Sequence, residues 1–379
     1  MKDHSLEVHG CHTYDATGAI SPSICLSATF RHPRFGESTG YDYGRVANPT
    51  RESLEKTVAL LERGGRSWAL SSGMAAVQLV FSLLSAGDHV LMSEDLYGGT
   101  VRLAEEVFAG YGIAFEYVDV RDLALVGKRM RPETKLIFIE TPSNPMMQIS
   151  DIAALSALAH ENGALLAVDN TFLSPHFQKP LTLGADIVLH SGTKYLCGHN
   201  DVIAGFLVLK DATSAQAKRI ELLAKSAGSN LSALDSWLML RSIKTLGVRV
   251  ERQAENALAI ARWLGTLPEV TEVLYPGLAD HPGYALQQKQ ASGAGGMISF
   301  KVRSAEIAKA ALGRLHLIAF AESLGGVETL LTYPIAQTHA EMPAPLLKRT
   351  GLDDKLLRLS VGIEDVEDLK ADLQQALQG

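Results

Sequence analysis

The stretch HSGTKYLCGHND, residues 190–201, is the most informative part of this chain. Lys194 follows the small turn Ser191-Gly192-Thr193, and an apolar run typical of a buried strand precedes that turn. A lysine just past a strand end, beside hydroxyl side chains, suits an amine that forms a Schiff base with a phosphate-bearing cofactor. The hydroxyls of Ser191 and Thr193 and nearby backbone N–H groups would bind the phosphate. A solvated surface lysine is the ordinary alternative, so the remaining sequence must decide.

A second apolar run, residues 164–168, ends in Asp169. An acid at the C-terminal end of a parallel strand points into the crevice where open α/β sheets bind ligands. Pyridoxal phosphate requires a carboxylate there, because pairing with the ring nitrogen keeps the ring protonated and able to accept electrons. Strand-end aspartates also cap turns, but the separation from Lys194 favours a cofactor site. We therefore predict pyridoxal 5'-phosphate as the cofactor.

A third segment, SSGMAA at residues 71–76, follows a short apolar run and opens a long apolar stretch. Serine followed by glycine is typical of a helix N-cap that another chain segment or a ligand approaches closely. The free N–H groups at Gly73 and Met74 and the helix dipole would attract the phosphate. An ordinary helix cap has the same pattern, so this segment gains weight only beside Lys194 and Asp169.

Together these segments resemble the pyridoxal-phosphate enzymes of cysteine and methionine trans-sulfuration. This family includes cystathionine γ-synthase, cystathionine β- and γ-lyases, methionine γ-lyase and the O-acylhomoserine sulfhydrylases. The resemblance covers nearly the whole chain. Its matching segments are TGAISPSICLSATF (17–30), YDYGRVANPTRESLE (41–55), SSGMAA (71–76), DLYGGT (95–100), ETPSNP (140–145), VDNTF (168–172), SGTKYLCGHND (191–201), AESLGGVETL (321–330) and RLSVGIED (358–365).

The resemblance implies fold type I of the pyridoxal-phosphate enzymes, an α/β fold like that of aspartate aminotransferase. The pattern along the chain predicts three parts. Residues 1–60 would form an N-terminal arm that contacts a neighbouring subunit. Residues 61–245 alternate strand-like runs, at 89–92, 136–140, 165–169, 187–190 and 203–209, with helical periods, which is typical of a mostly parallel sheet. Residues 246–379 would form a smaller α/β domain, with a helix at 250–264, strands at 270–274 and 297–302, and a closing helix at 365–377.

The resemblance also implies roles for residues around the cofactor. Tyr97 would stack on the cofactor ring and relay a proton, and Asn144 would hydrogen-bond the cofactor's phenolic oxygen. Tyr43 and Arg45 would reach across a subunit interface to the phosphate, for which a guanidinium and a phenol are suitable ligands. We therefore expect a homo-oligomer, a dimer of dimers with the active site shared across each dimer. Without the resemblance, Tyr97 could be a core aromatic and Asn144 a turn residue, and sequence alone would favour a solvated loop pair for Tyr43 and Arg45.

Three further residues would bind the substrate. Arg358 matches the arginine that grips the α-carboxylate of the amino-acid substrate, which a planar guanidinium can do with two hydrogen bonds. Ser323 matches the loop that lines this carboxylate and contacts the lysine. Glu322 resembles the acid of the γ-synthases and γ-lyases, and it could bind the distal ammonium of cysteine or cystathionine.

The reaction itself is less defined by the sequence. Glu322 favours cystathionine γ-synthase, which joins an O-acylhomoserine to cysteine. Gly99 stands where methionine γ-lyases carry a cysteine, which disfavours that activity. The segment TYPIAQTH, residues 332–339, resembles both γ-synthases and β-lyases, so cystathionine β- or γ-lyase remains the alternative and an O-acylhomoserine sulfhydrylase a further one. A non-catalytic cofactor-binding protein on this fold is a further alternative, disfavoured because every catalytic position is occupied. A pyridoxal-free lysine enzyme such as an aldolase is less favoured still, because it would not need Asp169 or a phosphate site.

Composition narrows the partners. The 379 residues are 46% hydrophobic and 20% charged with a net charge of −7, and no basic run suggests nucleic acid or a membrane surface. No apolar stretch reaches the ~20 residues of a membrane span, and residues 1–10 carry no targeting signal. Cys11, Cys25 and Cys197 are odd in number and widely spaced, which argues against disulfides and a zinc site. We expect a cytoplasmic enzyme acting on small amino acids, with no metal.

Overall fold

The structure is a computed structural model that describes residues 1–11 and 17–378. Within these residues the larger sheet has seven strands in the order β1-β7-β6-β5-β4-β2-β3. They are β1 (Arg66–Leu70), β2 (His89–Ser93), β3 (Ala114–Val118), β4 (Thr134–Glu140), β5 (Leu165–Asp169), β6 (Ile187–Ser191) and β7 (Gly205–Leu209). Strands β2 to β6 pair in parallel, whereas β7 is antiparallel to both β1 and β6. The predicted mostly parallel α/β sheet is therefore confirmed.

Both faces of this sheet are buried, which explains the continuous apolar runs in its strands. Leu166 and Val168 of β5 belong to one hydrophobic cluster, with residues of α2 (Pro49–Leu61) and α6 (Ile152–Glu161). Ala167, between them, belongs to a second cluster, with residues of α3 (Gly73–Phe81) and α8 (Ala215–Ala227). The strand predicted at 203–209 begins two residues later in the structure, at Gly205. Ile203 lies in the preceding loop and is 67% exposed.

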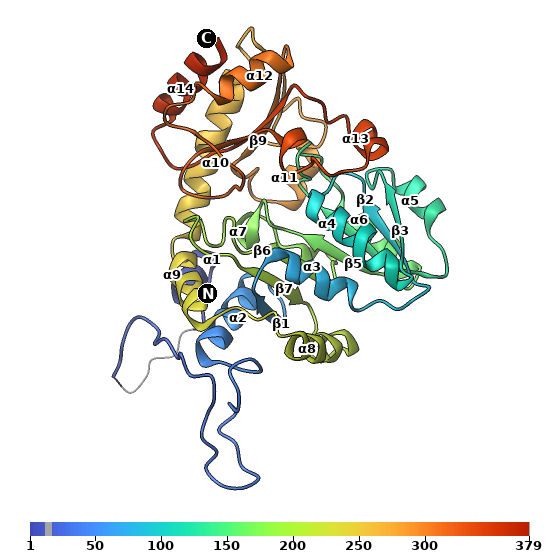
Figure 1. Cartoon of the computed structure of the whole chain (residues 1–379), viewed down its shortest axis with the longest axis vertical. Helices are drawn as coiled ribbons and strands as arrows, with labels where there is room; N and C mark the ends of the chain where they lie inside the picture. The colour runs from blue at the N-terminus through green and yellow to red at the C-terminus, as the bar shows by residue number, and fades with distance from the viewer. Residues whose placement is uncertain (12–16, 379) are drawn as a thin grey trace.

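Short helices complete this part of the chain. They are α1 (Asp3–His9), α4 (Gly98–Leu103), α5 (Leu123–Arg129), α7 (Ser174–Phe177) and α9 (Ala233–Ile243), with a π-helical turn at Ala104–Phe108 and 3₁₀ turns at Ala109–Tyr111 and Pro180–Leu183. The N-terminus of helix α2 is well capped. Asn48 Oδ1 accepts hydrogen bonds from the N–H groups of Thr50 and Arg51, at 3.0 and 3.2 Å, and Pro49 occupies the first helical position. Residues 17–48 form a long loop that extends away from the body (Figure 1).

The C-terminal part has its own sheet, which in the described chain has five strands in the order β10-β11-β12-β9-β8. The strands are β8 (Val270–Leu274), β9 (Met297–Val302), β10 (Ala319–Phe320), β11 (Leu330–Thr332) and β12 (Leu356–Ser360), and the helices are α10 (Leu246–Leu264), α11 (Tyr284–Gln290), α12 (Ala305–Leu312), α13 (Ala344–Thr350) and α14 (Val366–Gln378), with a 3₁₀ turn at Pro334–Ala336. A separate hydrophobic cluster joins this sheet to α10, α12 and α14. The predicted smaller C-terminal α/β unit is confirmed, and it lies across the loops of the larger sheet (Figure 1).

Glu140, Asp169 and Ser191 end the parallel strands β4, β5 and β6 at one edge of the larger sheet, and Glu140 pairs in register with Asp169. The smaller unit brings the loop at residues 322–324 and strand β12 toward this edge. Among the described residues, no helix is both long and apolar enough to cross a membrane.

Candidate active site

A cavity of about 310 Å³ lies at this edge of the larger sheet, where the smaller unit covers it. All but two of the residues expected at the site line it. Those lining it are Gly73, Met74, Tyr97, Asn144, Asp169, Ser191, Thr193, Lys194, Glu322, Ser323 and Arg358. The fold thus assembles groups that lie far apart in the sequence.

Lys194 sits in the turn after β6, as its sequence context predicts, and points into this cavity. Its Nζ donates a hydrogen bond to Ser323 Oγ at 2.8 Å. Burial, and next the nearby guanidinium of Arg358, lower the pKa of Lys194 to about 8. Ser323 adopts a φ of 104°, a backbone conformation that non-glycine residues rarely occupy, and such strain is typical of functional sites. The lysine is therefore poised to present a neutral amine.

Asp169 is held at the tip of β5 by its own turn. One oxygen, Oδ1, accepts the Thr171 N–H at 2.9 Å and the Thr171 hydroxyl at 2.5 Å, which leaves Oδ2 for a ligand. Burial raises the pKa of Asp169, while the Thr171 hydrogen bonds and then the charge of His190 oppose this shift. Thr171 also accepts the Ser191 N–H at 2.8 Å, so one residue orients both strand ends.

The start of α3 faces the same cavity. Ser72 caps this helix by accepting the Ala75 N–H at 3.1 Å, so the N–H groups of Gly73 and Met74 have no partner within the helix. A Cβ at Gly73 would lie 2.9 Å from Ser191 Cβ, which explains why glycine stands there. These features fit an anion-binding helix N-terminus.

The Thr193 hydroxyl has hydrogen-bond partners within the chain itself. It donates to the carbonyl of Ala204 at 3.2 Å and accepts the Ala204 N–H at 3.1 Å. The hydroxyl therefore holds the turn that carries Lys194 against the loop before β7, although the side chain still lines the cavity.

Arg358, on β12, is the buried cation of the site and is only 2% exposed. Its Nη1 donates to Asn144 Oδ1 at 2.7 Å, and Nη2 donates to the Ser323 carbonyl and the Thr332 hydroxyl, both at 3.4 Å. Its Nε has no hydrogen-bond partner among the described residues. Burial lowers the pKa of Arg358 to about 10, so it stays charged at neutral pH. A buried charge with an unused donor suits an anionic ligand group.

Asn144 lies between Arg358 and His339. Because Asn144 Oδ1 accepts from Arg358, the Nδ2 donor is the part of the amide left for a ligand. His339 Nε2 lies 3.0 Å from the Asn144 carbonyl oxygen, and burial, then Arg358, lowers the pKa of His339 to about 4. His339 is thus neutral at physiological pH and supports the turn that carries Asn144. Sequence reasoning did not identify it.

Glu140 was also missed. It is 5% exposed, lines the cavity and accepts the Tyr97 N–H on Oε2 at 3.1 Å. Burial, and next the neighbouring charge of Asp169, raise the pKa of Glu140 well above its ordinary value. Like Asp169 it ends a parallel strand, and that position was the signal that could have found it. It positions the backbone of Tyr97, whose side chain is 41% exposed at the cavity.

Tyr43 and Arg45 are the two expected residues that the chain does not bring to its own cavity. They lie in the loop before α2, beside Gly228 and Asn230, and both are exposed. The Arg45 guanidinium stands 5.7 Å from the centre of the Tyr43 ring and donates to the carbonyl of Lys225. In one chain they therefore take no part in the Lys194 site.

The groups that line the cavity fit pyridoxal phosphate. Lys194 has a lowered pKa, Asp169 Oδ2 is available for a ring nitrogen, and the N–H groups of Gly73 and Met74 are available for a phosphate. Arg358 Nε remains as an unused buried donor for a further anionic group. This arrangement defines a pyridoxal-phosphate-dependent enzyme of fold type I.

A model of the Cys/Met metabolism PLP-dependent enzyme family matches residues 4–378, and the chain belongs to this family. The chain is 47% identical over 379 residues to a cystathionine gamma-lyase of Bacillus subtilis, with all of both chains covered. It is also 47% identical to the cystathionine beta-lyase MetC of the same organism, covering 96% of this chain and 93% of that one. A crystal structure of a cystathionine gamma synthase from Xanthomonas oryzae, in complex with aminoacrylate and cysteine, matches with a TM-score of 0.96 and 41% identity over 100% of this chain and 98% of that chain.

These relatives confirm the predicted family and the cofactor. The chain is a pyridoxal-phosphate-dependent trans-sulfuration enzyme that acts on C–S bonds. The names of its relatives include a γ-lyase, a β-lyase and a γ-synthase, so they do not select one reaction.

Proposed function

We propose that this enzyme is a cystathionine γ-synthase, which forms cystathionine from an O-acylhomoserine and cysteine. The observation that carries the proposal is the position of Glu322. This exposed acid lines both the Lys194 cavity and the adjoining surface pocket. It is therefore available, at the mouth of the site, to the ammonium group of a second amino acid.

The inner end of the cavity supports binding of the first amino acid. A substrate α-carboxylate would accept hydrogen bonds from the Arg358 guanidinium, whose Nε has no partner among the described residues. Asn144 fixes one end of the guanidinium at 2.7 Å, and the Ser323 carbonyl and Thr332 hydroxyl hold the other. Because the arginine is already held, little side-chain freedom is lost when the carboxylate binds.

Pyridoxal phosphate, when bound, attaches to a lysine and supplies a ring that accepts electrons from the substrate. Lys194 would hold it, with Asp169 on the ring nitrogen and the Gly73 and Met74 N–H groups on the phosphate. Lys194 Nζ would also take and return the protons at the substrate α- and β-carbons, because its lowered pKa makes a neutral amine accessible near neutral pH. Ser323 Oγ, at 2.8 Å, keeps this amine aimed into the cavity.

Cystathionine cleavage by a γ- or β-lyase is the second candidate. It is supported by the names of the two Bacillus subtilis relatives, each 47% identical to this chain. The same groups would serve both synthesis and cleavage of the bond at the γ-carbon, since Glu322 would bind the distal ammonium of cystathionine as readily as the ammonium of cysteine.

Product identification tests the proposal. The purified enzyme should form cystathionine from O-acetyl- or O-succinylhomoserine and cysteine, and any 2-oxo acid it releases from cystathionine should be 2-oxobutyrate. Release of pyruvate from cystathionine, without synthesis from either ester, would make the enzyme a β-lyase. Rapid 2-oxobutyrate release without synthesis would make it a γ-lyase.

We also propose that the site is completed by a second copy of the chain. Tyr43 and Arg45 are exposed and do not line their own chain's cavity. They belong to the loop at residues 17–48, which extends from the body (Figure 1). A two-fold dimer could place this loop over the neighbour's helix α3, where a phenol and a guanidinium would complete the phosphate site. The expected cytoplasmic location remains a prediction.

A further inference from the structure

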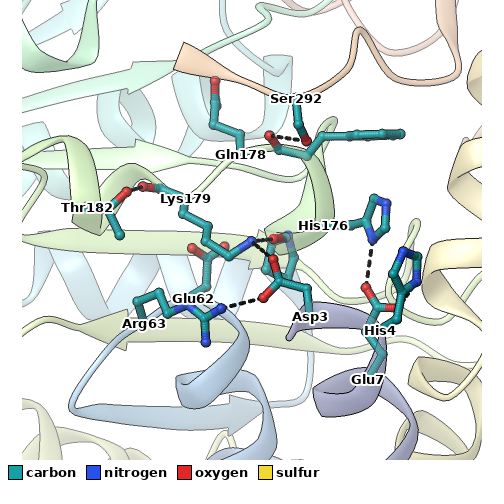
Figure 2. Close-up of polar contacts among 12 residues, drawn as sticks. Asp3, His4, Glu7, Glu62, Arg63, His176, Gln178, Lys179, Thr182 and Ser292 are labelled. Atoms are coloured by element: carbon teal, nitrogen blue, oxygen red, sulfur yellow. Dashed lines mark hydrogen bonds and ion pairs between the residues drawn. The ribbon is translucent and has the colours of Figure 1, made fainter. Parts of the chain in front are cut away.

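A second group of chemically suited side chains lies outside the Lys194 cavity, where α1 meets α7. His4 and Glu7 are one helical turn apart on α1, and His176 comes from α7 (Figure 2). One nitrogen from each histidine and one oxygen of Glu7 all lie within 4.8 Å of one another. The Glu7 side chain is 3% exposed and that of His176 is 8% exposed, so two of these groups are buried together.

The distances between these atoms suit a shared metal ion. His4 Nδ1 lies 3.7 Å from Glu7 Oε2, and His176 Nδ1 lies 2.7 Å from Glu7 Oε1. Zinc bonds of about 2.0–2.1 Å in tetrahedral geometry place neighbouring ligand atoms about 3.3 Å apart. One observed separation is longer than this value and the other is shorter, and each ends on a different Glu7 oxygen. Because one ligand atom from each residue already lies within 4.8 Å of the others, small side-chain movements would bring both imidazoles and the carboxylate to one ion.

Glu251, on α10, lies where the outer support of a metal site is expected. Its Oε1 is 3.4 Å from His4 Nε2 and 3.3 Å from His176 Nε2, the ring nitrogens that do not face Glu7. Histidines that bind a metal through one nitrogen nearly always donate the other N–H to a carboxylate or carbonyl, which fixes the ring. Here one carboxylate would orient both rings.

The backbone also leaves room for this group. The N–H of Gly247, at the start of α10, donates to Glu7 Oε2 at 3.2 Å. A Cβ at position 247 would lie 2.6 Å from Glu7 Oε2 and 2.8 Å from His4 Nδ1. Glycine therefore permits α10 to approach, and any larger residue would push the ligands apart.

We propose that His4, Glu7 and His176 bind a divalent transition-metal ion, with zinc the best match to two imidazoles and one carboxylate. Water would occupy the fourth position, because His4 is 62% exposed and leaves the site open to solvent. The ion would link α1 to α7, the helix that follows strand β5. It would also link α1 to α10, through the contacts of Glu251 with the two histidine rings. The sequence prediction of no metal rests on the cysteines, whereas these ligands are spread from residue 4 to residue 176.

Ion pairs of Asp3 also hold helix α1 in place, independently of the proposed metal site. Asp3 forms ion pairs with Arg63 and with Lys179, the latter at 3.0 Å (Figure 2). Removal of the exposed His4 ring should therefore leave α1 in place. His9, exposed on the last turn of the same helix, provides a matched control.

The experiment uses the holoenzyme without a polyhistidine tag, dialysed against buffered zinc chloride, with bound zinc measured by mass spectrometry. We expect about one zinc ion per chain, in line with a single three-ligand site. His4→Ala and His176→Asn should each abolish it, and His9→Ala should not. Glu251→Gln should weaken it by roughly 10- to 100-fold, the usual effect of losing a carboxylate behind a ligand.

A cobalt(II) titration adds a readout that is independent of stoichiometry. The wild-type enzyme and His9→Ala should develop the visible absorption of four-coordinate cobalt, and His4→Ala should not. Absence of saturable zinc binding by the wild type, or zinc binding that survives both His4→Ala and His176→Asn, would overturn the proposal and leave the group a hydrogen-bonded histidine–glutamate cluster.

Discussion

The lowered pKa of Lys194 makes a quantitative prediction about cofactor uptake. With a pKa of about 8, roughly 10% of the side chain is a neutral amine at pH 7. A lysine of ordinary pKa 10.5 is neutral to only about 0.03%. Only the neutral amine attacks the aldehyde, so covalent capture of pyridoxal phosphate by the apoprotein should be about 300-fold faster than by an exposed lysine of equal intrinsic reactivity.

The direction of the pH dependence follows from the same shift. Below pH 8 the amine is protonated, so the capture rate should fall about tenfold per unit, whereas above pH 8 it should level off. An ordinary lysine would continue to gain rate up to pH 10.5. The assay mixes apoprotein with pyridoxal phosphate by stopped flow from pH 6.5 to 10 and follows the absorbance of the attached cofactor. A free lysine derivative measured in parallel corrects for the titration of the cofactor itself.

Two variants separate the causes. Lys194→Ala should lose covalent capture, and borohydride reduction followed by peptide mass spectrometry should locate the wild-type cofactor on Lys194. Arg358→Leu removes the second-largest cause of the shift, so the midpoint should move above 8 but remain below 10.5, because burial persists. Arg252→Leu, an exposed arginine on α10, should leave it unchanged. A wild-type profile parallel to that of the free amine, or a cofactor found on another lysine, would refute the reasoning.

Further predictions concern the other groups of the site. Asp169→Asn should preserve the fold but slow α-proton exchange in deuterated water about a hundredfold or more, since a neutral partner no longer holds the ring nitrogen protonated; normal exchange would exclude the role. Mixing inactive Arg45→Ala chains with inactive Lys194→Ala chains should restore part of the activity, because some hybrid dimers then contain one intact site. No recovery, with hybrids shown to form, would count against a shared site. Glu322→Ala should weaken binding of cysteine or cystathionine by about 1–3 kcal/mol, seen as a raised KM, whereas an exposed-residue control, Glu133→Ala, should not; unchanged constants and product ratio would remove the main support for γ-synthase chemistry.

The fold was largely predictable because its central strands are buried on both faces. Such strands give uninterrupted apolar runs, as at 136–140 and 165–169. Two of the edge strands, β3 and β10, gave no such signal. Strand β3 is only partly buried and carries Glu116 among apolar residues, and the two residues of β10 are exposed and identified only by their pairing with β11. Their assignment depends on a neighbouring strand, which local sequence does not contain.

The site was predictable where one residue and its local context define the chemistry. Asp169 ends one strand and Lys194 lies in the turn after another, and both residues line the cavity, as that pattern predicts. His339 supports Asn144 across 195 positions of sequence, so only the folded chain shows the contact. The Thr193 hydroxyl bonds to Ala204 in the loop that follows, a contact that the local sequence does not indicate. Contacts of this kind depend on how loops meet.

The electrostatics of the cavity explain why these residues act together on an amino acid. Burial lowers the pKa of Lys194 to about 8 and raises the pKa of Glu140 well above its ordinary value, so both groups become neutral more easily than they would in water. Arg358 remains charged, and its Nε has no hydrogen-bond partner among the described residues. The hydrogen bonds that Thr171 donates to Asp169 oppose the rise in the pKa of Asp169 that burial causes. The cavity therefore has a cation at the substrate end and a carboxyl group at the strand end, together with a lysine that loses its proton more readily than an exposed lysine does. A substrate carboxylate would pair with Arg358, and a protonated cofactor ring would pair with Asp169. Such charge pairs are much stronger where water is excluded than in bulk water.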